Sequence, residues 1–169
     1  MDKETNILNL NQIITDFSND IEVTPTLLQE RRNRIFELES AMCGVPESYG
    51  MDKINEGRVR HHFGTGVYGR ELFIPAGEVI VSKIHKGKTF NIIAKGRISV
   101  IDPEKGFNTY EALTTFVSSP MTKRVVIAHE DTVWITTHAN ENNSEDLLEI
   151  EEKTIAKNFE DKHLIKEVL

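Results

Sequence analysis

The chain has 169 residues, 38% of them hydrophobic, with a formal net charge of −7. This length and apolar content suit one domain with a buried core, and the acidic balance argues against non-specific nucleic-acid binding, because duplex phosphates would repel it. No apolar run approaches the roughly 20 residues of a membrane span, the first ten residues lack a signal-peptide core, and the lone Cys43 excludes an intrachain disulfide. We therefore expect a cytoplasmic protein without membrane contact.

Residues 1–60 are expected to form a helical N-terminal extension. Thr24 and Pro25 are suited to the cap and first position of a helix over residues 24–43, which Gly44 and Pro46 would end. Its apolar residues recur at roughly helical spacing, at Leu28, Ile35, Leu38 and Met42. We interpret its basic run, residues 31–34, as a solvated helix face, and residues 44–65, with His61 and His62, as a linker.

Residues 61–138 are expected to form a β-barrel. Short segments rich in β-branched and aromatic residues alternate with turn chemistry such as Pro75-Ala76-Gly77 and Lys86-Gly87-Lys88. The predicted strands cover residues 66–74, 78–84, 89–95, 97–102, 108–110, 113–117, 124–128 and 131–137. Seven or eight short strands at this spacing are typical of an all-β sandwich or barrel. Residues 139–169 would return to an acidic helical tail, capped by Asn143 or Ser144.

Strand alternation groups residues two apart on one face. Of four such faces, several are apolar at one end and polar or cationic at the other, which is the composition of a ligand pocket. These faces hold Tyr68, Arg70, Leu72 and Ile74; Val79, Val81, Lys83 and His85; Arg124, Val126 and Ala128; and Thr132, Trp134, Thr136 and His138.

The candidate ligand-binding residues are Tyr68, Arg70, Lys83, His85, Asn91, Arg124, Trp134 and His138. Inward-facing cations need partners, because a buried charge left alone costs several kcal/mol, on the order of a domain's stability. The partner is either an internal carboxylate, from Glu71, Glu78, Glu130 or Asp131, or an anionic ligand. Trp134 and Tyr68 serve either as core packing or as a pocket wall, and Asn91 either contacts the ligand or satisfies a buried neighbour.

Two stretches, residues 75–102 and 116–138, resemble the two-motif core of the cupin superfamily, and the resemblance covers residues 66–138. Residues 61–100 and 120–138, with the flanks 30–46 and 144–161, are more narrowly similar to small cupin-like proteins of tailed bacteriophages and prophages. The resemblance implies a cupin-type jelly-roll β-barrel between helical extensions, in the host cytoplasm if the protein is phage-encoded. It also implies a homo-oligomer, because cupin-like proteins commonly pair through their sheets.

The metal-binding pattern of cupins, three histidines and a glutamate, is largely missing. His85 matches the first histidine, but the second falls on Gly87, the glutamate on Asn91 and the third histidine near Arg124. A cation at that place is hostile to a divalent ion, so we predict no metal and no other cofactor. The alternative is a rearranged set drawn from His62, His85, His129 and His138.

Three functions follow as hypotheses. The first is a metal-free phage protein that binds a small anionic ligand, such as a nucleotide or signalling nucleotide, to counter host defence. The second is a metal-free epimerase or isomerase that uses His85 as a base. The third is a virion or assembly component. No nucleophile arrangement, P-loop or dinucleotide fingerprint is present, so no catalytic residue is assigned.

Overall fold

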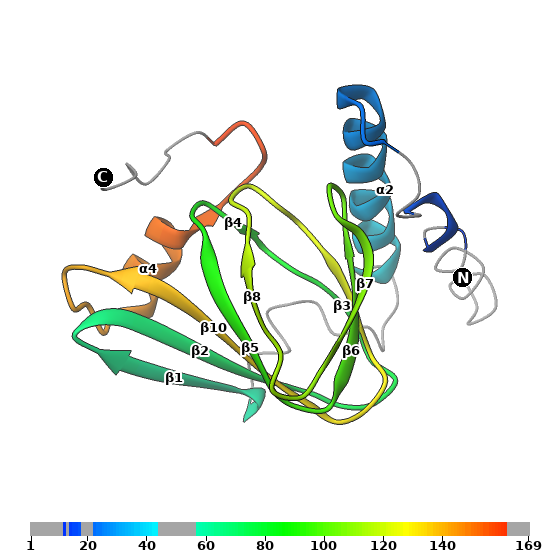
Figure 1. Ribbon diagram of the computed structural model, residues 1–169. Coiled ribbons are helices and arrows are strands. Elements are labelled where there is room, and N and C mark those ends of the chain that lie inside the picture. The colour runs from blue at the N-terminus through cyan, green and yellow to red at the C-terminus, as the bar shows by residue number, and fades with distance from the viewer. Residues whose placement is uncertain (1–11, 13, 18–21, 44–56, 162–169) are drawn as a thin grey trace.

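The computed structural model describes residues 12, 14–17, 22–43 and 57–161. Two antiparallel sheets face each other across one core (Figure 1). The five-stranded sheet has the order β1 (Val59–Gly64), β2 (Gly66–Ile74), β10 (Thr132–Asn140), β5 (Thr89–Lys95) and β8 (Thr115–Ser118). The four-stranded sheet has the order β3 (Val79–Val81), β9 (Val125–Ala128), β6 (Arg97–Asp102) and β7 (Gly106–Glu111). This mainly β, jelly-roll architecture with helical extensions on both sides confirms the predicted fold class.

The core between the sheets follows the strand alternation. Leu72, Ile74 and Trp134 come from the five-stranded sheet and meet Val126 and Ala128 of the other. These five residues were predicted to lie on inward faces. Their contiguous burial stabilises the barrel through the apolar area that it removes from water.

The helix α2 (Pro25–Cys43) stands against the outer face of the four-stranded sheet (Figure 1). Its start is as predicted, because the backbone N–H of Leu27 donates to Thr24 Oγ1 at 3.2 Å. Ile35 and Leu38 pack on the outward side of the sheet with Val81 and Ile101. Gly44 and Pro46, the expected stop signals, lie outside the described residues.

The interpretation of residues 31–34 as a solvated face is wrong for Arg31, which is only 2% exposed. Its guanidinium donates to the carbonyl oxygens of Asp16 and Pro103, both at 3.2 Å, and lies over the ring of Phe17. The buried charge is therefore hydrogen-bonded to backbone acceptors and ties the helix to the barrel.

The predicted strand 78–84 is broken in two. Val81 faces α2, whereas Ile80 belongs to the barrel core, so the inward face of β3 is the opposite of the one predicted. After an irregular step at Ser82 and Lys83, the short strand β4 (Ile84–His85) pairs with β11 (Ile155–Ala156). This break changes the alternation, and Ser82, Lys83 and His85 all line the cavity described below.

Two further elements differ from the predictions. Residues 59–64 form β1, an edge strand paired along its whole length with β2, and are not a linker. The helix α4 (Leu147–Thr154) is capped by Asp146, whose carboxylate accepts from the N–H groups of Leu148 and Glu149. Ser144 does not cap it, because Ser144 is held in the preceding turn by two hydrogen bonds with Asn140.

Candidate functional site

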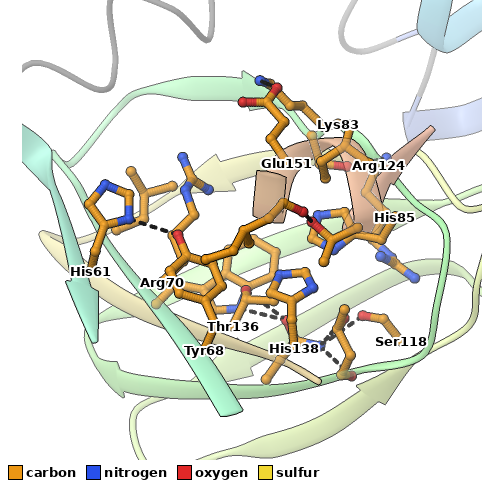
Figure 2. Close-up of a pocket in the computed structure, with 18 of the residues that line it drawn as sticks. His61, Tyr68, Arg70, Lys83, His85, Ser118, Arg124, Thr136, His138 and Glu151 are labelled. Atoms are coloured by element: carbon orange, nitrogen blue, oxygen red, sulfur yellow. Dashed lines mark hydrogen bonds and ion pairs between the residues drawn. The ribbon is translucent and has the colours of Figure 1, made fainter. Parts of the chain in front are cut away.

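A cavity of about 240 Å³ lies between the two sheets, at the end where α4 and β11 close against the barrel (Figure 2). Strands β2, β10 and β5 supply one wall, the segment Ser82–His85 and Arg124 supply another, and the C-terminal segment supplies the third. Every candidate ligand-binding residue lines it: Tyr68, Arg70, Lys83, His85, Asn91, Arg124, Trp134 and His138.

Four ring side chains form a series along the cavity. The rings of His85 and His138 are stacked with centroids 4.9 Å apart, and His138 stacks in turn on Tyr68 at 5.9 Å. His61 continues the series, because its Nδ1 lies 2.7 Å from the Tyr68 hydroxyl. The pairing of His138 with Tyr68 across β10 and β2 brings two of these rings together.

Burial controls the protonation of these rings. It lowers the pKa of His138 to about 4, with Arg70 adding to the effect. Burial also lowers the pKa of His85 well below its usual value, with help from His138 and the three cations Arg70, Lys83 and Arg124. Both imidazoles are therefore neutral at neutral pH, where each has one donor and one acceptor nitrogen. Among the described residues, His85 Nδ1 is the one buried side-chain polar atom without a hydrogen-bond partner.

Arg124 and Lys83 have carboxylate partners, and these differ from the four predicted. Arg124 Nε donates to Asp102 Oδ2 at 2.8 Å, and both side chains are under 10% exposed. Lys83 forms an ion pair with Glu151 of α4 at the edge of the cavity (Figure 2).

The four carboxylates predicted as partners serve elsewhere. Glu71 pairs with Arg60 and His62, Glu78 pairs with Arg58, Glu130 pairs with Arg97, and Asp131 accepts from the backbone of Ala76. The structure thus confirms that internal pairing occurs but corrects its members.

Asn91 forms hydrogen bonds with the polar side chains around it. Its Oδ1 accepts from Trp134 Nε1 and Thr136 Oγ1, both at 3.1 Å, and its Nδ2 donates to Ser118 Oγ at 2.8 Å. The residue is 1% exposed. Asn91 was predicted either to contact the ligand or to form hydrogen bonds with buried polar neighbours, and the structure favours the second alternative. These hydrogen bonds make Asn91 a positioning residue for the cavity wall.

Two serine hydroxyls add donors to the cavity. Ser118 Oγ accepts from Asn91 Nδ2, and Ser82 Oγ accepts from the backbone N–H of Arg124 at 2.9 Å. Because a hydroxyl has one proton, each serine can still donate that proton toward the cavity. The polar groups of the wall are therefore mainly donors, which suits an acceptor-rich ligand.

Sequence reasoning missed several cavity residues. His61 was assigned to the linker, because a strand at residues 59–64 has little apolar content to signal it. Leu147, Ile150, Glu151 and Ile155 fall in the predicted helical tail, for which no docking surface was predicted. A signal was present in the short apolar repeat of the tail, but nothing in the sequence says which surface that repeat covers.

The donor set does not fit the metal that cupins hold. Among the described residues, no group of three or more His, Cys, Asp or Glu side chains could hold a metal ion. The rearranged alternative is also contradicted: His62 pairs with Glu71 on the outside of β1, and His129 bonds to Ser99, so neither joins His85 and His138. The proximity of Arg124 and Arg70 to His85 opposes a divalent ion further.

No protein-family model and no curated protein matches the sequence. Solved structures that are similar include a cupin-2 domain protein from Shewanella frigidimarina, with 8% identity, coverage of 48% of this chain and 80% of that one, and a TM-score of 0.40. A cupin superfamily protein from Desulfitobacterium hafniense matches at 10% identity, 50% and 80% coverage, and a TM-score of 0.41. Ectoine synthase from P. lautus matches at 10% identity, 54% and 75% coverage, and a TM-score of 0.44. Likeness at this level carries no information about ligand or reaction. The resemblance to phage and prophage proteins stays a prediction.

No helix within the described ranges is long and apolar enough to cross a membrane.

Proposed function

We propose that the cavity binds a small anion and does so through protein donors, without a metal ion. The observation that supports this proposal is the convergence of Arg70, Lys83 and Arg124 on one cavity, beside the hydroxyls of Ser82 and Ser118. Guanidinium, ammonium and hydroxyl groups all donate to carboxylate or phosphate oxygens. Tyr68 and Trp134 would pack against the rest of the ligand.

The size and charge of the cavity favour a small, singly charged ligand. Its volume of about 240 Å³ falls below the ~300–1,000 Å³ of pockets that enclose drug-sized molecules. Glu151 and Asp102 form ion pairs with Lys83 and Arg124, which reduces the positive charge that an entering ligand would meet. A small organic monoacid fits this balance, whereas a nucleotide would be enclosed only in part.

The test is an isothermal titration of the purified protein with short carboxylic acids, sugar acids and nucleotides, in the presence of a chelator. We expect at least one small monoanion to bind and Lys83→Gln to weaken it, because Lys83 faces the cavity with limited exposure. Lys153→Gln is the matched control, since Lys153 lies on α4 but does not line this cavity. If no anion binds, or if both variants lose affinity equally, the proposal is wrong.

One observation favours the alternative of an epimerase or isomerase. The 2.7 Å contact between His61 Nδ1 and the Tyr68 hydroxyl places a pair of proton-transfer groups in the cavity. In this alternative the His61–Tyr68 pair would work beside His85. Conversion of a titrated ligand, followed by NMR in the same samples, distinguishes a reaction from binding alone.

The setting of this function rests on the sequence resemblance. We propose a protein of phage or prophage origin that acts in the host cytoplasm, where removing a small signalling anion would counter host defence. A titration in which cyclic or signalling nucleotides bind more tightly than monoacids would support this setting over a metabolic one, and it would overturn the preference for a monoacid proposed above.

A further inference from the structure

Glu151 is the only carboxylate among the residues that line the cavity in the described part of the chain. It lies on α4, whose buried Ile150 and Thr154 face the barrel. The end of this helix is fixed, because the backbone N–H of Lys86 donates to the Thr154 carbonyl at 2.8 Å and β11 pairs with β4 directly afterwards. The carboxylate is therefore held at the cavity mouth by the fold.

The charge of Glu151 acts on the groups that would receive an anion. The carboxylate pairs with Lys83, and the charged ends of the two side chains lie together at the edge of the cavity (Figure 2). Burial lowers the pKa of Arg70, and Glu151 counteracts that change; burial raises the pKa of Tyr68, and Glu151 adds to the rise. An incoming anion thus meets the attraction of the cations and the repulsion of one fixed carboxylate.

We infer that Glu151 is a specificity-determining residue that favours ligands with one negative charge over ligands with two. This inference rests on the proposed anion-binding function. The electrostatic part of the binding free energy is proportional to the ligand's charge. Removing the carboxylate therefore strengthens binding of a dianion by the square of the factor by which it strengthens binding of a monoanion.

The expected size of the change in affinity follows from the exposure of Glu151. Its side chain is 50% exposed, so solvent partly screens its charge. An exposed charge interaction changes a binding constant by up to about fivefold. We expect Glu151→Gln to strengthen the binding of a monoanion by up to about fivefold and that of a dianion by up to about 25-fold. The ratio of the two binding constants then changes by up to about fivefold.

The test uses methanesulfonate and sulfate, which share a tetrahedral shape but carry one and two charges throughout the neutral pH range. Affinities are measured by titration calorimetry at constant ionic strength for the full chain and for Glu151→Gln. Glu152→Gln is the matched control, because it removes the same charge from the next residue of α4, which does not line the cavity. Glu151→Asp keeps the charge and should keep the wild-type ratio.

A larger gain for sulfate than for methanesulfonate in Glu151→Gln alone supports the inference. Equal gains for both anions would mean that the substitution only opens the cavity, and would overturn it, as would the same ratio change in Glu152→Gln. If the wild-type protein binds a small acid but the sulfate-to-methanesulfonate ratio does not change, the inference fails while the proposed function stands. If neither the wild type nor Glu151→Gln binds any anion, the proposed function itself fails, and the inference with it.

Discussion

The neutral, buried His138 predicts an unusual sensitivity of the fold to mild acid. Burial, reinforced by Arg70, lowers its pKa from 6.5 to about 4. In the unfolded chain the same imidazole takes up a proton near pH 6.5. Between these two values the unfolded state binds more protons, so the free energy of unfolding falls as the pH is lowered. The stabilising contribution is complete above pH 6.5 and is lost progressively down to about pH 4.

The expected loss at pH 5 from His138 alone is roughly 2 kcal/mol relative to pH 7.5, by linkage between the folded and unfolded pKa values. His85, whose pKa is lowered further in the same direction, adds to the loss. The groups that bear on the His138 ring are Tyr68 and Arg70 from β2 and His85 from β4. None of them offers a carboxylate that would favour the imidazolium.

The assay is urea denaturation at pH 7.5 and pH 5.0 for the wild type and for His138→Gln, with the free energy of unfolding from linear extrapolation. We expect the variant to lose about 2 kcal/mol less than the wild type between the two pH values. Contributions of titrating groups that do not interact with His138 are common to both proteins and cancel in this difference, whereas His85 cancels only in part, because His138 helps to lower its pKa. His62→Gln, which replaces an exposed histidine of β1, serves as a control for the substitution itself. Equal losses for His138→Gln and the wild type would refute the reasoning.

Two stability predictions concern buried polar groups. Asn91→Ala should lower the free energy of unfolding by about 2–3 kcal/mol, because Trp134 Nε1 and the Thr136 hydroxyl lose a buried acceptor; an unchanged midpoint in denaturant would contradict the proposed network. Asp102→Asn should cost about 3–5 kcal/mol, because it leaves the charge of Arg124 buried without its partner. The same measurement applied to Arg124→Ala separates its two predicted roles: a loss of this size identifies a structural ion pair, whereas a stable variant that no longer binds the anion identifies a ligand contact.

The residues of the cavity were largely predictable, because the long strands keep strict alternation. In β2 and β10, every second side chain faces the interior without interruption, from Tyr68 to Ile74 and from Thr132 to His138. Once one apolar member of each strand is assigned to the core, the polar members of the same parity must face the same interior. The spacing of residues along these strands was therefore enough to predict that Arg70 and His138 face the cavity.

The same logic failed where a strand is short. In residues 78–85, three residues of β3 are followed by an irregular step, so Val81 turns toward α2 while Lys83 and His85 still reach the cavity. The prediction placed Lys83 and His85 correctly only because the break offset a wrong choice of face. A break of two residues leaves little trace in composition, since both parities of VIVSKIH carry apolar residues.

Pairing partners could not be predicted, because they join residues that are distant in the chain. Asp102, the last residue of β6, reaches Arg124 just before the start of the neighbouring strand β9, and Glu151 reaches Lys83 from a helix 68 residues further on. A sequence pattern identifies which faces carry cations but not which carboxylates the topology brings to them. The consequence for the proposed function is specific. Carboxylates already pair with Lys83 and Arg124, so we expect the cavity to select ligands by charge as well as to attract anions. The two carboxylates differ in exposure and therefore in their expected roles. Asp102 is buried with Arg124 and holds its guanidinium in place. The Glu151 side chain is half exposed at the edge of the cavity, where we expect its charge to act on an entering ligand.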